Sequence, residues 1–218
     1  MSAAGQEIFD AARSGDTARL QALLASEPGL VNARNERGHS PVLIAQYHHK
    51  KAALAVLLAA GPELDLFDAA SVGDTARVEA LLDRDPSQIG AYSADGFYPL
   101  GLAAFFGHAA TVKLLIARGA NLTQVARNPM RVQPLNAAVA GRSMDAVRLL
   151  VEAGAPVDPQ QQEGWTPLHG AVHQGNVEMT KYLLDHGADP KLQNDKGKNA
   201  IGLAADEGNL AILKLLKG

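Results

Sequence analysis

The sequence predicts an all-α protein with short β-hairpin loops, folded as a solenoid of stacked helix–turn–helix units. The first observation is the string Thr166-Pro167-Leu168-His169-Gly170-Ala171 followed by Gly175, because parts of it recur along the chain. The anchor of the string recurs at Pro41, Pro99, Pro134, Pro167 and Ala200. The second observation is that an alanine follows each anchor after four residues: Ala45, Ala103, Ala138, Ala171 and Ala204. Spacings of 35, 33 and 33 residues between the last four anchors indicate a repeat architecture.

Each part of a unit has a physical reason. Thr166 is a helix N-cap residue, and Pro167 stands at the first helical position, where its missing N–H costs nothing. The alanines allow the short first helix to approach its neighbour closely, and Gly175 is suited to end it in a left-handed conformation. A second helix follows, with apolar residues on one face at Val147, Leu149 and Leu150. A polar stretch such as residues 161–164 then predicts a projecting hairpin.

Two less regular anchors, at positions 7 and 65, complete the series 7, 41, 65, 99, 134, 167 and 200, which defines seven predicted units in one domain. The expected boundaries are 5–34, 38–63, 64–94, 95–127, 128–160, 161–193 and 194–218. Only 24 residues separate the second and third anchors, at positions 41 and 65, so about ten residues are missing from a 33-residue unit. We therefore expect one hairpin to be absent there, with the helices still stacked.

A second periodicity of 58 residues relates the first four units to one another. Residues 8–12 and 15–19 reappear at this offset as residues 66–70 and 73–77. The offset also relates Pro28, Pro41 and Gly61 to Pro86, Pro99 and Gly119. The first four units thus look like a duplicated pair, to which three further units were added singly.

From about Glu7 to Gly218, the chain resembles the ankyrin repeat, whose marks are the 33-residue length and the T-P-L-H-x-A string. Only the sixth unit carries that string unchanged. His49 and Arg142 stand where a helix-ending glycine is expected, and Gly141 offers an alternative position for the second of these turns. Arg131 and Val132 stand where a hairpin glycine and its neighbour would be.

Composition excludes several classes of function. A net charge of −3 with interspersed signs argues against nucleic-acid binding, which favours a basic stripe. No apolar run approaches the ~20 residues of a membrane span, so we expect no membrane insertion. The first five residues show no basic and apolar leader, and there is no cysteine; both observations favour a cytoplasmic protein.

Catalytic and metal sites are not expected, and no cofactor is predicted. The chain has no cysteine, no Gly-x-Ser-x-Gly elbow and no phosphate-binding glycine loop. His169 has the family position of a structural hydrogen-bonding ring. The adjacent His48 and His49 point in different directions from one helix, so they do not form a metal clamp by themselves.

The family resemblance also implies where a partner would bind. Ankyrin proteins usually meet partners on the concave face, formed by hairpin tips and by the ends of the first helices. Five of the ten aromatic residues map to this face: Tyr47, Phe97, Phe105, Phe106 and Trp165. His48 and His173 occupy neighbouring positions, and the missing hairpin would open lateral access. The alternative is that these rings pack between repeats.

The leading functional hypothesis is a non-catalytic scaffold that mediates protein–protein interaction through its concave face. The alternative is a binder of a small molecule or short peptide in the central aromatic groove, and an enzyme of unrecognised type comes third. A closed pocket would favour the small-molecule hypothesis. Polar residues at both ends predict a monomer or weak dimer.

Overall fold

The computed structural model describes residues 3–217, which form fourteen α-helices, three short 3-10 helices and no regular strand. The predicted helix–turn–helix solenoid is confirmed. The helices form seven pairs: α1 (Ala3–Ser14) with α2 (Thr17–Ser26), α3 (Pro41–Tyr47) with α4 (Lys51–Ala59), α5 (Leu66–Val72) with α6 (Thr75–Arg84), α7 (Pro99–Phe105) with α8 (Ala109–Ala117), α9 (Pro134–Ala140) with α10 (Met144–Glu152), α11 (Pro167–His173) with α12 (Val177–Asp185), and α13 (Ala200–Asp206) with α14 (Leu210–Lys217). The 3-10 helices are η1 (Pro28–Asn32), η2 (Pro86–Gly90) and η3 (Gln162–Gly164).

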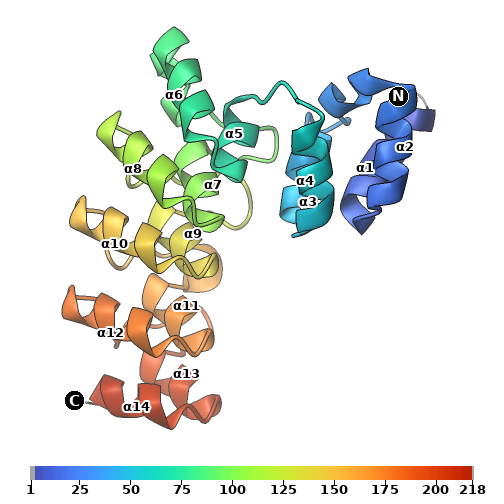
Figure 1. Cartoon of the computed structure of the whole chain (residues 1–218). Helices are drawn as coiled ribbons and strands as arrows, with labels where there is room; N and C mark the ends of the chain where they lie inside the picture. The colour runs from blue at the N-terminus through green and yellow to red at the C-terminus, as the bar shows by residue number, and fades with distance from the viewer. Residues whose placement is uncertain (1–2, 218) are drawn as a thin grey trace.

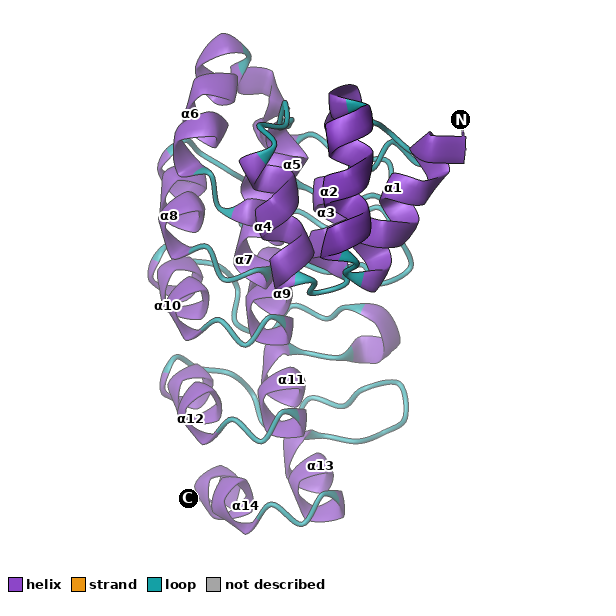
Figure 2. Ribbon diagram, turned by 45° about the vertical axis from the view of Figure 1, so that its right-hand side comes forward, coloured by secondary structure: helices purple, strands orange, loops and turns teal. Residues whose placement is uncertain are grey.

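The helix pairs from α5 to α14 stack into one column, and α1 to α4 lie beside its upper end (Figure 1). Loops that follow the second helices project from one side of the column as fingers (Figure 2). We refer to these segments as finger A (33–40), finger B (91–98), finger C (120–133), finger D (155–166) and finger E (188–199). A continuous core of small and branched residues, including Ala45, Ala103 and Leu115, runs between the helices.

The helix starts show two solutions to the same capping problem. In α11, the Thr166 hydroxyl caps the helix and the His169 ring donates from Nε2 to the carbonyl of Lys198 (3.0 Å). In α7, the N-cap position holds Tyr98, and its hydroxyl donates to the carbonyl of Val132 (3.1 Å). The Tyr98 ring occupies the space of the missing histidine, because a Cβ on Gly101 would lie 2.9 Å from it.

The fingers are hairpin turns too short to form regular strands. Backbone hydrogen bonds cross each of fingers A to E, for example from Ser93 N to the Phe97 carbonyl (2.8 Å) and from Ala126 N to the Val132 carbonyl (2.9 Å). Backbone hydrogen bonds also join neighbouring fingers of the column: Arg127 N to Gly96 O (2.8 Å), Gln162 N to Met130 O (3.0 Å) and Asp195 N to Glu163 O (2.9 Å). These bonds align fingers B to E into one wall.

Between α4 and α5 there are only six residues, 60–65, and no hairpin, so the expected finger is absent. The expectation that all helices stay stacked there is only partly right. α3 packs against α5, but α4 and α6 diverge (Figure 1). The chain bends at this point because no finger separates the two first helices.

Buried polar contacts hold the bend. The Ser40 hydroxyl donates to Asp68 (2.6 Å), and the Arg34 guanidinium contacts Asp68 at 2.8 Å and Asp65 at 3.1 Å. Burial raises the pKa of Asp68, with the Asp65 charge adding to the rise, while Ser40 and Arg34 lower it. The amide of Gln46 adds a hydrogen bond to the Ser71 carbonyl (2.7 Å). These contacts join the first two helix pairs to the third.

The 58-residue offset of the sequence is also an offset of the structure. The starts of α2, η1, α3 and α4 recur 58 residues later as the starts of α6, η2, α7 and α8. The ends of α1, α3 and α4 recur in the same way as those of α5, α7 and α8. The shared bounds support the predicted duplication of a two-unit segment.

Candidate functional site

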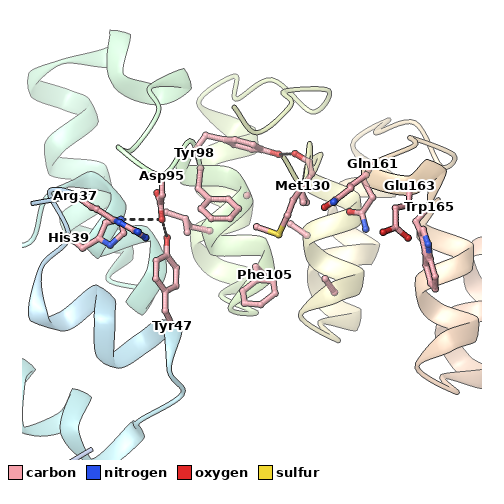
Figure 3. Close-up of a pocket in the computed structure, with 17 residues that line it drawn as sticks. Arg37, His39, Tyr47, Asp95, Tyr98, Phe105, Met130, Gln161, Glu163 and Trp165 are labelled. Carbon is pink, nitrogen blue, oxygen red and sulfur yellow. Dashed lines mark hydrogen bonds and ion pairs between the residues drawn. The ribbon is translucent and has the colours of Figure 1, made fainter. Parts of the chain in front are cut away.

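A pocket of about 660 Å³ lies between the first helices and the fingers in the middle of the chain (Figure 3). We call it the central pocket. Tyr47 lies at one end, Trp165 at the other, and Phe105 and Met130 lie between them (Figure 3). The lining residues come from α3, α7, α9 and fingers A to D: Arg37, His39, Tyr47, Asp95, Phe97, Tyr98, Gly101, Leu102, Phe105, Met130, Val132, Ala137, Ala140, Gln161, Gln162, Glu163 and Trp165. Three first helices and four fingers therefore contribute to one elongated site.

The structure brings together most of the residues that the sequence placed on the concave face. Tyr47, Phe97, Phe105 and Trp165 line the central pocket. Phe106 lies in an adjoining hollow. His48 and His173 are exposed and line neither of the two. His173 instead contacts Glu207 (2.7 Å) and packs against Trp165 in a T-shaped pair, with ring centroids 5.5 Å apart.

The aromatic rings are half-buried. This burial is intermediate between the two alternatives for these rings, an exposed contact surface and packing between repeats. Phe105 and Phe106 meet edge to face with centroids 5.0 Å apart. Tyr47 stacks on Phe106 at 6.1 Å and contacts Phe97 at 6.3 Å. All four pack against the core on one side. The rings thus support one another while one side stays accessible from the pocket.

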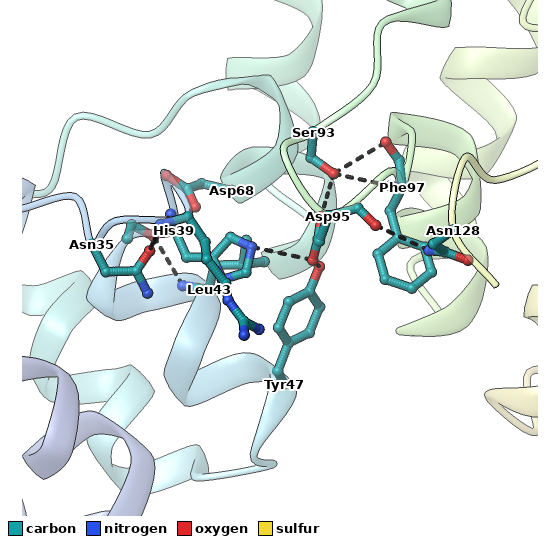
Figure 4. A network of polar contacts seen from close by, with 11 residues as sticks. Asn35, His39, Leu43, Tyr47, Asp68, Ser93, Asp95, Phe97 and Asn128 are labelled. Atoms are coloured by element: carbon teal, nitrogen blue, oxygen red, sulfur yellow. Dashed lines mark hydrogen bonds and ion pairs between the residues drawn. The ribbon is translucent and has the colours of Figure 1, made fainter. Parts of the chain in front are cut away.

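A polar cluster closes the Tyr47 end of the pocket (Figure 4). The Tyr47 hydroxyl donates to Oδ2 of Asp95 (2.9 Å), and His39 Nε2 lies 3.2 Å from the same oxygen. The Ser93 hydroxyl donates to Oδ1. Burial alone would raise the pKa of Asp95, but the hydrogen bonds from His39, Ser93 and Tyr47 lower it to about 2. Burial, followed by the Asp95 carboxylate, raises the pKa of Tyr47.

We call this cluster the finger clamp, because it joins finger A to finger B. No backbone hydrogen bond joins these two fingers, in contrast to the later ones. The missing finger makes them neighbours, and Asp95 supplies the link through its side chain. Sequence reasoning missed His39 and Asp95, since the contact depends on the bend and joins residues 56 positions apart in the sequence.

A second hollow of about 410 Å³ adjoins the central pocket, because both are lined by Phe105 and Ala140. We call it the basic hollow. Its other lining residues are Gln46, His49, Lys51, Phe106, Gly141 and Arg142. It contains two cationic side chains and no acidic one. The aromatic pocket therefore continues into a basic surface at the ends of the first helices.

Four non-glycine residues between Ala3 and Lys217 have a left-handed backbone, and all lie at or beside these two hollows. They are His49 (φ 53°), Arg131 (φ 51°), Arg142 (φ 58°) and Glu163 (φ 59°). Five other units place glycine at the position of His49 and Arg142: Gly15, Gly73, Gly107, Gly175 and Gly208. Such backbone costs a non-glycine residue of order 1 kcal/mol.

Gly141 does not take over the turn, contrary to the alternative that the sequence offered. Its φ is −75°, and the left-handed residue is Arg142. Glycine is required at 141 for a different reason, because a Cβ there would lie 1.8 Å from the Phe105 carbonyl oxygen. The end of α9 thus approaches the end of α7 closely.

Within residues 3–217, no group of three or more His, Cys, Asp or Glu side chains is placed to hold a metal ion. The buried His169 serves the structural role described above, and burial lowers its pKa. Across the same residues, no helix has the length and apolar character of a membrane span.

The stacked helix pairs and the aligned fingers define a helix–turn–helix repeat solenoid. The family model for ankyrin repeats in three copies matches residues 66–160 and 135–218, which together cover more than half of the chain. The chain belongs to the ankyrin-repeat family. No curated protein matches the sequence. The family generally mediates protein–protein interaction and is typically non-catalytic.

Proposed function

We propose that this protein is a non-catalytic scaffold that binds another protein through its concave face, with the central pocket as the main contact site. The observation that carries the proposal is the convergence of half-buried rings from fingers B and D and from helices α3 and α7 on one pocket. Aromatic side chains are enriched in binding hot spots, because they bury a large area at little entropic cost. A pocket of this kind suits a side chain or short segment of the partner.

The contact residues in this proposal are Phe105 and Trp165, which anchor the partner, and Tyr47 and Phe97, which extend the contact. Phe106 supports Phe105 from the basic hollow. His48 and His173 belong to the margin of the surface. The helix pairs act as one domain of seven units, and the protein works without a cofactor as a cytoplasmic monomer or weak dimer.

Paired affinity capture and thermal melts test the proposal. Phe105→Ala and Trp165→Ala should each release the captured partner, since truncating a hot-spot ring costs about 2 kcal/mol, or thirtyfold in affinity. Both rings are half-buried, so their truncation should cost less than the ~3–5 kcal/mol of a fully buried phenylalanine. Partner recovery that is unchanged in both variants would contradict the proposal.

The pocket also gives specific support to the second hypothesis, a small molecule or short peptide. Its volume of about 660 Å³ lies within the usual range for ligand pockets, about 300–1,000 Å³. The pocket is elongated, however, with Tyr47 of α3 at one end and Trp165 of finger D at the other (Figure 3). We therefore favour an extended peptide segment. A thermal-shift screen with small metabolites would favour the small-molecule hypothesis if it gave a saturable shift that Phe105→Ala abolishes.

A further inference from the structure

We propose that the groove formed by the central pocket and the basic hollow binds an acidic peptide segment with a large apolar side chain. This inference rests on the proposed function and specifies its partner. The apolar side chain would enter the central pocket beside Phe105 and Met130. Carboxylates next to it would meet Lys51 and Arg142 in the basic hollow.

The first support is the pairing state of the charges along the groove. Asp95 accepts hydrogen bonds from Tyr47 and Ser93 and contacts His39 in the finger clamp. Glu163 pairs with Lys196 at 3.2 Å. The side chains of Arg37, Lys51 and Arg142 form no ion pair within residues 3–217. The groove thus offers unpaired cations on a chain whose net charge is −3.

The second support is the backbone of the basic residues. At the turn after the first helix, glycine would adopt the left-handed conformation without strain, and five units have it. The exceptions are His49 and Arg142, and both line the basic hollow. Arg131 makes the corresponding exchange at the tip of finger C, where four other fingers have Gly38, Gly96, Gly164 and Gly197. Strained positions that persist without a structural benefit point to function.

The third support is the continuity of the two hollows. Phe105 and Ala140 line both, so a bound segment can fill the central pocket and reach the cations without leaving the surface. The groove runs from Tyr47 to Trp165 across several fingers, which suits an extended chain (Figure 3). Apolar contacts would supply affinity, and the charges would favour acidic over basic segments.

Selection of short random peptides displayed on phage, with the full-length protein immobilised, tests the inference. Selected peptides should carry aspartate or glutamate next to an aromatic or large aliphatic residue. One such peptide, labelled with a fluorophore, should bind about fivefold more weakly to Lys51→Gln and to Arg142→Gln, the effect of an exposed ion pair worth about 1 kcal/mol. Lys113→Gln is the matched control, because Lys113 is exposed on α8 outside both hollows.

A separate variant distinguishes function from structure at the left-handed turn. Arg142→Gly should raise the melting temperature by about 2 °C, because glycine relieves the strain. It should nevertheless weaken peptide binding as much as Arg142→Gln does. If Arg142 were merely structural, its loss would leave binding unchanged.

Three results would overturn the inference, and the first two of them would leave the proposed function intact. The first result is a set of selected peptides without an excess of acidic residues. The second is a binding affinity that is unchanged in both Lys51→Gln and Arg142→Gln. Either result would contradict the acidic segment alone. The scaffold function would survive if Phe105→Ala still abolished that binding. If the wild-type protein bound the peptides no more tightly than Phe105→Ala does, both the acidic segment and the pocket as a contact site would be contradicted.

Discussion

Replacing Asp95 with asparagine tests whether the finger clamp stabilises the bend. The substitution keeps the size of the side chain but removes the charge that His39, Tyr47 and Ser93 surround. A pKa lowered from 3.8 to about 2 corresponds to roughly 2 kcal/mol of preference for the ionised form in the folded state. The Asp95 side chain is 20% exposed, so solvent screening reduces this figure, and we expect about 1–2 kcal/mol.

The pH dependence has a defined sign. The pKa of Asp95 is lower in the folded than in the unfolded chain, so its stabilisation is complete above about pH 4 and is lost as the pH falls toward 2. Urea denaturation of the wild type and Asp95→Asn at a series of pH values measures the difference. That difference should be largest at neutral pH and shrink below pH 4.

Glu36→Gln is the control, because Glu36 is exposed near the tip of finger A and has no partner within residues 3–217. It removes the same charge and should change stability by less than ~0.5 kcal/mol. A stability difference for Asp95→Asn that stays constant from pH 6 to the acid limit would refute the clamp as described. So would a difference no larger than that of Glu36→Gln.

Three further substitutions have effects that follow from particular contacts. Gly141→Ala should lower stability by at least about 2 kcal/mol in a thermal melt, because the new Cβ would lie 1.8 Å from the Phe105 carbonyl oxygen. Gly101→Ala should also destabilise by ~1–3 kcal/mol, since its Cβ would lie 2.9 Å from the Tyr98 ring; combined Tyr98→Thr and Gly101→His should be better tolerated, as measured by urea denaturation. Asp68→Ala should cost about 2–3 kcal/mol in the same assay, because Ser40 and Arg34 lose their buried carboxylate partner.

Two positions in the same chain serve as controls for these substitutions. Gly29→Ala should be close to neutral, because no atom lies within 4 Å of the added Cβ. Asp10 stands 58 residues before Asp68 but is exposed, so Asp10→Ala should cost little. Equal losses for Asp10→Ala and Asp68→Ala would mean that burial at the bend does not decide the effect.

The helices and their stacking follow from local signals in the sequence. A proline at the first helical position starts α3, α7, α9 and α11, and small residues set the close packing between first helices. The spacing between these signals also predicted the missing finger, because the 24 residues between the anchors at positions 41 and 65 leave no room for one. Such signals act within a few residues, so a single sequence suffices to read them.

The finger clamp and the bend depend on contacts that no local signal carries. His39 and Asp95 lie on different fingers, and they meet only because α3 packs directly against α5. The sequence placed the aromatic rings on one face, but their partial burial depends on how Tyr47 stacks on Phe106 across the bend. Tyr98 and Gly101 stand where the motif has threonine and histidine. The sequence did not reveal that these two replacements compensate for each other, since each residue alone looks like a loss of the motif.

The departures from the repeat pattern are concentrated around the groove, and this distribution bears on function. The sixth unit keeps the full string from Thr166 to Ala171. Thr166 and His169 of that string cap α11, and His169 also forms a hydrogen bond with the Lys198 carbonyl. Tyr98 and Gly101 line the central pocket, and the left-handed His49 and Arg142 line the basic hollow. The missing finger makes fingers A and B neighbours, and residues of both line the central pocket. A repeat array is stabilised by each unit and its neighbours, so strain in the middle of the stack can be offset by regular units on either side. Sequences tend to violate local rules where function requires it. The irregular units are therefore those in which a partner should be sought.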